Sequence, residues 1–441
     1  MKQYSQMKDS EIEWIGKIPK HWKNSKYKFL TSRVIVGIAE GSTHAYVDDG
    51  IPLIRSTNVR PNHLRSKNLI FINTEFAMKN TSKSLKENDI LTVRTGYPGV
   101  SAIVPRELND SQCFTLLIST PRKKQSPYFL CNWLNSDIAK NIFEIEGWGA
   151  AQINISVSIL KNIPIFEPPF EEQKQIADYL DKKTKIIDNE ISKNQKLIKS
   201  LKEKRQSVIN HTVTKGLDDT VSMKKSKIPG IGKIPEHWIP TKLKFYTTKI
   251  GSGITPKGGA DSYVKEGIPL IRSQNVHFDG LHLDDVAYIT LDIHKKMSNS
   301  KILENDVLLN ITGASIGRTT SIPKKFGEAN VNQHVCIIRT NQKLYHNFLT
   351  YFLTSSQLQT WISAIQVGAS REGLTFEEIK NFIILLPSNL EQKQIADYLD
   401  SKITNINSLI SKIKLQIKQL QEFRETLISS SVTGKIKVAE A

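Results

Sequence analysis

The chain has 441 residues, 39% of them hydrophobic, which is enough for roughly three domains with buried cores. Its 61 Lys and Arg residues outnumber its 43 Asp and Glu residues, and the resulting net charge of +18 favours a polyanionic partner. A basic protein without such a partner is the alternative. The 3 cysteines lack the spacing of a metal site or a disulfide framework, and no apolar run is long enough to cross a membrane. We therefore expect a cytoplasmic protein.

The same motifs occur twice in the same order, about half a chain apart. The repeated pairs are GKIPKHW (16–22) and GKIPEHW (232–238), IPLIRSTNV (51–59) and IPLIRSQNV (268–276), ENDIL (87–91) and ENDVL (304–308), and EQKQIADYLD at 172–181 and 391–400. A duplicated chain forms a pseudo-dimer within one polypeptide. Such symmetry suits a target that is itself nearly two-fold, and duplex DNA is the commonest such target.

Taken in chain order, each half is predicted to contain three parts. A short segment with Pro, Trp and basic residues comes first, at 16–28 and again at 232–244. A mixed region follows, whose strand-like β-branched runs are IPLIRS (51–56), ILTVRTG (90–96), FTLLIST (114–120), VLLNITG (307–313) and VCIIRT (335–340). A long polar helix ends each half, at about 171–210 and 390–430.

These parts predict a mixed α/β fold, internally duplicated, with two globular domains separated by a long antiparallel two-helix coiled coil. The predicted domains are 1–168 (first target-recognition domain), 169–215 (first spacer helix), 216–388 (second target-recognition domain) and 389–435 (second spacer helix).

Both helices carry a heptad pattern of apolar residues, which is typical of a coiled-coil seam. The predicted seam residues are Leu180, Ile187, Ile191, Ile198, Leu201, Arg205, Leu399, Ile403, Ile406, Ile410, Ile413, Ile417, Leu420 and Arg424. The second globular region begins soon after the first helix ends, so the second helix is expected to run back antiparallel to the first. A register with Arg205 near Ala396 and Arg424 near Ala177 pairs large with small residues and avoids two adjacent arginines. A zipper between two separate chains is the alternative.

No catalytic motif is complete. EPPF (167–170) looks like the D/N-P-P-Y/F signature of adenine methyltransferases but begins with Glu, and the second copy reads LPSN (386–389), so a turn before the helix explains both. TGASIG (312–317) lacks the third glycine and the βαβ context of a dinucleotide loop. There is no GxxxxGK[ST] motif, and the 10 histidines show no metal-ligand spacing. We expect Trp22 and Trp238 to pack internally, with the preceding His21 and His237 at the surface.

Hydrogen-bonding side chains recur at matching places beside the predicted strands. Arg binds guanine, and Asn or Gln binds adenine, through paired hydrogen bonds in the major groove. Lys, Ser, Thr and Gly-rich loops bind phosphates. The candidate DNA-binding residues are Arg55, Ser56, Asn58, Arg94, Thr95, Gln152, Asn154, Arg272, Gln274, Asn275, Thr255, Lys257, Thr312, Ser315, Arg318, Asn332, Gln333, Ser370 and Arg371. The alternative for each is that it closes a turn or satisfies a buried backbone group.

Together these motifs resemble the specificity (S, DNA-recognition) subunits of type I restriction–modification systems of bacteria. The resemblance rests on the twin EQKQIADYLD helix starts, the IPxHW and IPLIRSxNV segments, the ENDxL strands and GITP (253–256), where the first half departs with EGSTH (40–44). It covers essentially the whole chain. It implies two target-recognition domains, each for one half of an interrupted DNA sequence, and a helical spacer that sets the gap between the half-sites.

The resemblance also implies partners and cofactors. Two modification (methyltransferase) subunits would carry S-adenosylmethionine, and restriction subunits, where present, would use ATP and Mg²⁺. The chain itself is then expected to be non-catalytic, with no cofactor or metal of its own. Two alternatives stay open: a self-contained DNA methyltransferase or nuclease, and a basic coiled-coil adaptor that binds RNA or protein.

Overall fold

The computed structural model describes residues 3–12, 15–39, 41, 43–147, 154–366 and 373–438. The chain forms two compact units, which we call unit 1 (Met1–Asn194 with Lys414–Ala441) and unit 2 (Gln195–Ile413). The long helices α6 (Phe170–Lys215) and α11 (Asn389–Val432) each contribute one segment to each unit. Among the described residues, no helix is both long and apolar enough to span a membrane.

Unit 1 is built on two four-stranded sheets. Its strands are β1 (Met7–Asp9), β2 (Lys17–Pro19), β3 (Lys23–Lys26), β4 (Thr31–Val36), β5 (Tyr46–Val47), β6 (Ile51–Ile54), β7 (Val59–Arg60), β8 (His63–Leu64), β9 (Ile70–Ile72), β10 (Ile90–Thr92), β11 (Ser101–Ile103), β12 (Gln112–Cys113), β13 (Leu117–Pro121) and β14 (Pro164–Glu167). Its shorter helices are α1 (Tyr27–Leu30), α2 (Thr74–Lys79), α3 (Pro127–Leu134), α4 (Asp137–Glu146) and α5 (Val157–Asn162). One sheet has the order β11-β10-β13-β4 and is antiparallel, and the other, β12-β6-β9-β5, contains the parallel pair β12 and β6.

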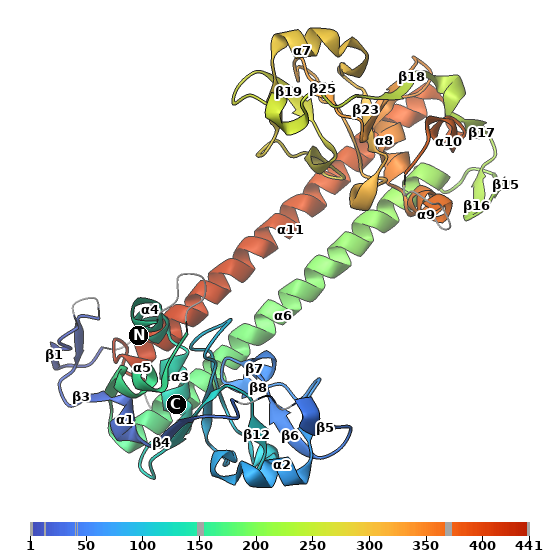
Figure 1. The fold of residues 1–441 in the computed structure, drawn as a ribbon. Helices are drawn as coiled ribbons and strands as arrows, with labels where there is room; N and C mark the ends of the chain where they lie inside the picture. Colours follow the sequence, from blue (N-terminus) through green and yellow to red (C-terminus); the bar gives the residue numbers. More distant parts are fainter. Residues whose placement is uncertain are drawn as a thin grey trace. The chain divides into compact units, whose positions relative to one another are not determined.

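Unit 2 repeats this topology. Its strands are β15 (Met223–Ile228), β16 (Ile231–Pro235), β17 (Ile239–Lys242), β18 (Thr247–Ser252), β19 (Ile268–Ile271), β20 (Val276–His277), β21 (Gly280–Leu281), β22 (Ala287–Ile289), β23 (Val307–Asn310), β24 (Thr319–Ser321), β25 (Asn330–Val331), β26 (Val335–Thr340) and β27 (Ile383–Leu386). Its shorter helices are α7 (Leu291–Lys296), α8 (His346–Thr354), α9 (Ser356–Gln366) and α10 (Phe376–Lys380). The order β18-β26-β23-β24 matches β4-β13-β10-β11, and β19 pairs in parallel with β25 as β6 does with β12. The duplication predicted from the sequence is confirmed at the level of topology (Figure 1).

Each unit packs its sheet and short helices onto its own segments of the two long helices. In unit 1 the aromatic core around Trp22 and Trp133 includes Leu180 of α6 and Leu427 of α11. In unit 2 the equivalent core includes, among others, Trp238, Phe348, Ile209, Val213, Ile395 and Leu399. The helices are therefore part of the domain cores at their ends, where burial of apolar surface stabilises both helix and domain.

One glutamate in the first turn of each long helix joins two of the repeated motifs. Glu172 of α6 accepts a hydrogen bond from Nε1 of Trp22 at 3.2 Å, and Glu391 of α11 accepts one from Trp238 at 3.0 Å. Both indoles are fully buried, as predicted. The histidine before each Trp is half exposed and contacts the same glutamate, at 2.8 and 3.0 Å. The GKIPxHW segments thus hold the start of each domain on the start of its helix.

The EPPF and LPSN segments form the turns that lead into the long helices. Nε2 of the buried Gln173 donates to the Pro168 carbonyl at 3.0 Å, and Gln392 repeats this bond with Pro387 at 3.0 Å. The same turn therefore serves both copies. This geometry supports the structural interpretation of these segments over the methyltransferase one.

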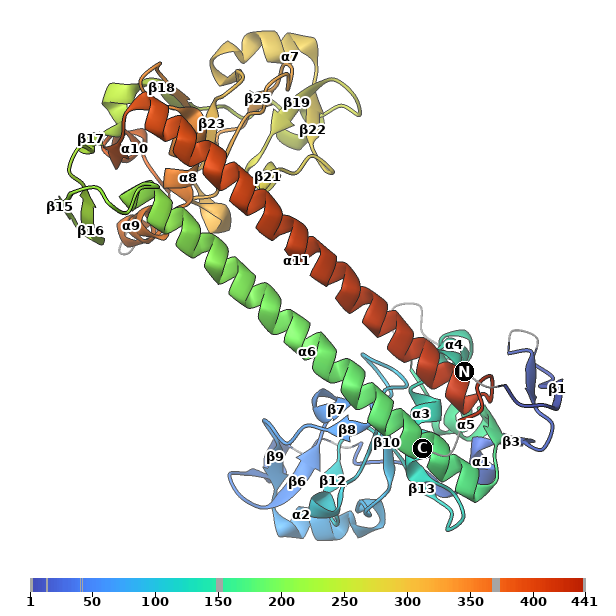
Figure 2. The ribbon, with the colours of Figure 1, turned by 180° about the vertical axis from the view of Figure 1, so that it is seen from behind.

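The two long helices are antiparallel within each unit, and their register differs from the predicted one. Figure 2 shows the ribbons of α6 and α11. In unit 1, Arg424 pairs with Asp188, and in unit 2, Arg205 donates to Asn407 at 3.0 Å. The arginines therefore lie about three helical turns from the alanines that we expected to face them. The prediction of direction is confirmed and that of register is wrong, because the packing of the helix ends in the domain cores sets the register.

The predicted seam between the two long helices is buried at some positions and half-buried at others. The predicted seam residues Leu180, Ile187, Leu399, Ile406 and Ile410 are buried. The others are half-buried: Ile191, Ile198, Leu201, Arg205, Ile403, Ile413, Ile417, Leu420 and Arg424. Leu180, Ile187 and Leu399 also pack into the domain cores, whereas the buried Ile406 and Ile410 lie near the middle of α11 and outside those cores.

Candidate nucleic-acid interface

In unit 2, three polar loops meet where the strands β19, β23 and β25 end. Nδ2 of Asn310, the last residue of β23, donates to the carbonyl of Ser273 at 2.7 Å and to Oγ of Ser315 at 3.1 Å. The backbone N–H of Asn332 donates to the carbonyl of Ile271 at 3.1 Å. These bonds bring together loops 272–275, 311–318 and 332–334, which are far apart in sequence.

His334 links two of the predicted DNA-binding residues within this cluster. Its Nδ1 lies 2.6 Å from Oγ1 of Thr312, and its Nε2 lies 2.9 Å from Nε2 of Gln333. Both ring nitrogens are therefore engaged by neighbours. The arrangement holds the Thr312 and Gln333 side chains in one place at the end of the sheet.

A close backbone approach brings a fourth loop to the same end. The N–H of Gly253 donates to the Asn332 carbonyl at 3.1 Å, and a Cβ at this glycine would lie 1.7 Å from the Val331 carbonyl oxygen. Only glycine fits here, which explains the first residue of the GITP motif. The exposed Thr255 and Lys257 follow this contact.

The IPLIRSxNV motif ends in a turn whose asparagine is structural. Asn58 and Asn275 are buried, and each accepts a hydrogen bond from the backbone N–H of the preceding arginine, at 3.1 and 3.0 Å. Their Nδ2 groups donate to the carbonyls of Arg65 and His282. This geometry corrects the expectation that the two asparagines contact bases, because their amides already satisfy buried backbone groups.

The other polar residues of these turns remain near the surface. Ser56 is half-buried and Gln274 is exposed. The Arg272 guanidinium donates to the Asp285 carbonyl at 2.8 Å and lies 5.7 Å from the Tyr263 ring centre. Asp285 also accepts a hydrogen bond from Gln274. Sequence reasoning missed Asp285 as the partner of Arg272 and Gln274, because the equivalent residue of the first half is Asn68 and the two copies share no acidic residue here. The Asn68 carbonyl oxygen lies 3.4 Å from the Arg55 guanidinium.

Unit 1 has the same loop scaffold with different side chains. The N–H of Phe114 donates to the Ile54 carbonyl at 2.8 Å, as Asn332 does to Ile271 in unit 2. Phe114 and Thr115 therefore stand where unit 2 has Asn332 and Gln333. Two similar scaffolds thus present different chemical groups.

The loop after β10 carries the remaining predicted residues of unit 1. Arg94 and Ile155 exchange hydrogen bonds, with Arg94 Nε at 3.3 Å from the Ile155 carbonyl and the Ile155 N–H at 3.1 Å from the Arg94 carbonyl. Thr95 beside it is exposed and Asn154 is half-buried. In unit 2 the half-buried guanidinium of Arg318 makes no hydrogen bond to any described residue. Gln152, Ser370 and Arg371 lie outside the described residues.

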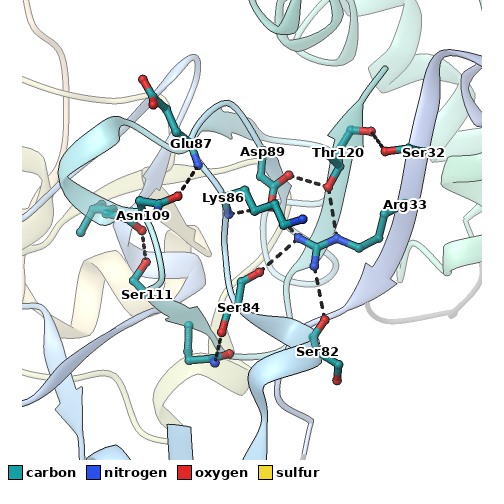
Figure 3. Close-up of polar contacts among 12 residues, drawn as sticks. Ser32, Arg33, Ser82, Ser84, Lys86, Glu87, Asp89, Asn109, Ser111 and Thr120 are labelled. Atoms are coloured by element: carbon teal, nitrogen blue, oxygen red, sulfur yellow. Dashed lines mark hydrogen bonds and ion pairs between the residues drawn. The ribbon is translucent and has the colours of Figure 1, made fainter. Parts of the chain in front are cut away.

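A buried aspartate from each ENDxL motif supports the strand that precedes these loops. In unit 1 (Figure 3), the fully buried Asp89 contacts Arg33 at 2.6 Å and accepts from Thr120 Oγ1 at 2.5 Å. Arg33 also donates to Thr120 and to the carbonyls of Ser82 and Ser84. A buried carboxylate must be paired in this way to be tolerated in a core.

In unit 2 the arginine sits on the neighbouring strand. Asp306 is fully buried and takes two hydrogen bonds from Arg339 of β26, at 2.7 and 2.8 Å. Arg339 is paired with Lys249 of β18, where unit 1 pairs Thr120 with Arg33. The hydrogen bonds from Arg339 to Asp306 raise the pKa of this arginine, while burial and the charge of Arg339 lower the pKa of Lys249. Both halves therefore contain an ion pair to the buried aspartate, but its arginine lies on β4 in unit 1 and on β26 in unit 2.

The loop 312–317 is not a dinucleotide loop. It forms a short 3₁₀ turn at Gly313–Ser315 between two antiparallel strands of one sheet, β23 and β24. A phosphate-binding glycine loop would lead into a long helix. The rejection of this motif therefore stands.

Comparison with known proteins assigns this scaffold. A family model described as the type I restriction modification DNA specificity domain matches residues 18–199 and 245–419, once in each half. The chain belongs to this family. The resemblance inferred from its motifs is thereby confirmed.

Specificity subunits are among its curated relatives. The type I restriction enzyme MjaVIII specificity subunit of Methanocaldococcus jannaschii is 25% identical over 434 residues, covering 98% of this chain and 93% of that protein. The EcoKI specificity subunit of Escherichia coli K12 is 21% identical over 436 residues, covering 96% and 90%. The putative MjaX specificity subunit of M. jannaschii is 28% identical over 327 residues, covering 73% and 71%. These relatives are all named as specificity subunits of type I restriction enzymes, in agreement with the family model.

Solved structures share the fold. A chain from a structure on complex assembly and conformational transition of the type I R-M system has a TM-score of 0.75 at 16% identity, covering 95% of this chain and 99% of that chain. The HsdS subunit from Thermoanaerobacter tengcongensis has a TM-score of 0.55 at 17% identity, covering 95% and 98%. The mixed α/β, internally duplicated fold class is thus confirmed.

Proposed function

We propose that this chain reads a bipartite, asymmetric DNA sequence, with each unit contacting one half-site. The observation that carries the proposal is the loop scaffold at the strand ends, which is built twice with the same backbone bonds but different side chains. Gln333 and Thr312 offer an amide and a hydroxyl in unit 2, whereas Asn332 is buried and its Oδ1 accepts from the His334 N–H at 3.1 Å. In unit 1, Arg94 and Thr95 offer a guanidinium and a hydroxyl. Different donors on one scaffold would select different bases.

The charge of the chain supports the DNA partner. A net charge of +18 supplies a salt-dependent attraction to phosphates that is independent of sequence. Base contacts in two separated half-sites would then multiply the specificity. We expect the affinity for duplex DNA to fall steeply as salt is added.

The long helices fit the role of a spacer and of a docking surface. Helix α6 continues without a break from unit 1 into unit 2, so its length would help to set the gap between half-sites. Apolar side chains remain exposed along both helices, among them Ile186, Leu197, Leu409, Leu415 and Phe423. We infer that two modification subunits, which would carry S-adenosylmethionine, cover such residues. Restriction subunits, where present, would supply ATP- and Mg²⁺-dependent cleavage.

The experiment that tests this function is long-read methylation mapping of cells with and without this chain. The proposal predicts a split, asymmetric motif with methylated adenine that disappears when the chain is deleted and returns on complementation. A motif that persists without the chain overturns the proposal. So does purified chain that binds random and genomic duplex DNA no better than single-stranded RNA across a salt series.

A further inference from the structure

The hairpin formed by β20 and β21 in unit 2 brings two histidines and an aspartate together. His277, Asp279 and His282 each place one ligand atom within 4.8 Å of the others. The two imidazole rings are stacked, with centres 4.0 Å apart and planes 17° apart, and His282 Nε2 lies 3.2 Å from Asp279 Oδ1. The cluster lies outside the polar loops of the candidate interface. Its three side chains take no part in the hydrogen bonds that join those loops to one another.

The donor set suits a borderline transition metal. Zn²⁺ and its neighbours bind imidazole nitrogen and carboxylate oxygen, whereas Mg²⁺ and Ca²⁺ prefer oxygen ligands alone. Tetrahedral zinc with bonds near 2.0–2.1 Å needs its ligand atoms roughly 3.4 Å apart, so the three side chains must close slightly. They are free to do so, because the side chains of Asp279 and His282 are 53% and 49% exposed.

A hydrogen bond holds His277 in a tautomer that suits metal binding. Its Nε2 lies 2.8 Å from the Gln274 carbonyl oxygen, to which it donates its proton. In that tautomer Nδ1 carries the free lone pair that a metal ligand needs. Metal-binding histidines almost always donate their other ring N–H to a carbonyl or carboxylate in this way, which fixes the orientation of the ring.

The first half of the chain has the same hairpin without the ligands. In β7 and β8, Val59 pairs with Leu64 and Arg60 with His63, as Val276 pairs with Leu281 and His277 with Gly280. The three ligand positions are occupied by Arg60, Asn62 and Arg65. Arg60 donates to the Thr57 carbonyl at 3.2 Å, as His277 does to Gln274. The two hairpins thus share their register and the pair Val–Leu, while all three ligand positions differ.

The residues of the first hairpin exclude a metal there. Two guanidiniums cannot act as ligands, and the Asn62 amide is engaged with Asn132 and Asn135. This hairpin carries a permanent positive charge. The second hairpin would gain a comparable charge only by binding a cation.

We propose that His277, Asp279 and His282 form a binding site for one divalent transition-metal ion of the zinc class. Three protein ligands leave a coordination position for water. The ion tightens the hairpin next to the Ser273–Asn275 turn, because His282 and Asn275 are joined by two hydrogen bonds of 2.9 Å each. The site is specific to the second half of the chain.

The test is calorimetric titration of Zn²⁺, Ni²⁺ and Mg²⁺ into the full-length chain, prepared without a histidine tag and stripped with chelator. We expect one Zn²⁺ or Ni²⁺ per chain and no binding of Mg²⁺. H277A, D279N and H282A should each weaken the affinity by at least about tenfold. The matched control is H63A, which removes an exposed histidine from the equivalent hairpin of unit 1 and should leave the titration unchanged.

A second measurement separates loss of the site from loss of folding. The thermal midpoint of the wild-type chain should rise with Zn²⁺ because the ion binds the folded state, while that of H282A should stay constant. H282A without metal should unfold like the wild type, because the side chain is half exposed. Absence of saturable binding by the wild-type chain overturns the proposal. Binding that H277A and H282A leave intact also overturns it.

Discussion

The guanidinium of Arg424 on α11 forms a two-point ion pair with the carboxylate of Asp188 on α6, at 2.9 and 3.3 Å. The equivalent positions of the other unit hold Arg205 and Asn407, joined by a single hydrogen bond of 3.0 Å. The same cross-helix contact therefore exists twice, once as an ion pair and once as an amide contact. Both contacts lie at the same antiparallel register, since Arg424 and Asp188 in unit 1 correspond to Arg205 and Asn407 in unit 2.

We predict that this ion pair contributes modestly to stability. A double-mutant cycle with D188A and R424A should give a coupling energy of about 0.5–1 kcal/mol, because both side chains keep contact with water. Chemical denaturation of the four proteins at low and high salt measures it. N407D should strengthen the equivalent contact in unit 2. A coupling energy indistinguishable from zero would show that helix packing alone sets the register.

The buried aspartates should matter far more. D306N leaves the Arg339 guanidinium without its carboxylate, and loss of one partner of a buried pair costs about 3–5 kcal/mol. The control is E87Q, which changes an exposed carboxylate in the equivalent motif of unit 1 and should be nearly neutral. Scanning calorimetry of the variants provides the comparison, and equal effects of D306N and E87Q would refute the argument.

The arginine that pairs with the buried aspartate lies on different strands in the two units, and this difference allows a rescue experiment. R339T alone should destabilise unit 2, since Asp306 then lacks its partner. Adding K249R recreates the arrangement that Arg33 and Thr120 form around Asp89, so the double variant should recover most of the lost free energy of unfolding. If the double variant is no more stable than R339T, the two arrangements are not interchangeable.

The three thiols should be inert in the folded protein. Burial raises the pKa of Cys113 and of Cys336 to about 12 and also raises that of Cys131. The reactive thiolate is therefore negligible at pH 8. A colorimetric thiol reagent should label none of them before denaturant is added and all 3 afterwards. Rapid labelling of the native chain would contradict the burial of Cys113 in β12, Cys131 in α3 and Cys336 in β26.

Paired changes of helix length should alter the gap between half-sites without altering the bases read. Removing one heptad from both α6 and α11 shortens the helices by about 10 Å, equivalent to at most about three base pairs at 3.4 Å each. Removing it from one helix should leave the pair mismatched and the protein insoluble. Methylation mapping and solubility measure the two outcomes. A well-folded single-helix deletion would argue against pairing of the two helices within one chain.

Much of the fold could be predicted from the sequence because repetition and periodicity are local signals. The β-branched runs at 90–96 and 335–340 contain β10 and β26, and the segments with heptad periodicity form α6 and α11. The register could not be predicted, because it depends on residues such as Ile209 and Leu427 that pack into domain cores as well as into the seam. A heptad pattern alone fits several registers that differ by whole turns.

The candidate site was only partly predictable, because the side-chain chemistry of a residue does not determine its exposure. Asn58 and Asn275 have the amide group that a base contact needs, but in both residues this amide is hydrogen-bonded to backbone N–H and carbonyl groups. Gly253 could be singled out as part of a motif, but the reason for glycine there is a tertiary contact, because a Cβ would lie 1.7 Å from the Val331 carbonyl oxygen. The His277 cluster was missed because its ligands are spaced for a hairpin, whereas the motifs searched for belong to helices.

The central claim is that the two units read different halves of one DNA target. Its most direct test is methylation mapping of R94A and R318A, each expressed with the modification subunits. R94A should relax one half-site and R318A the other, while the opposite half-site and the gap stay unchanged in each case. If both variants relax the same half-site, or if either one alters both, the two units do not read independently and the account is wrong.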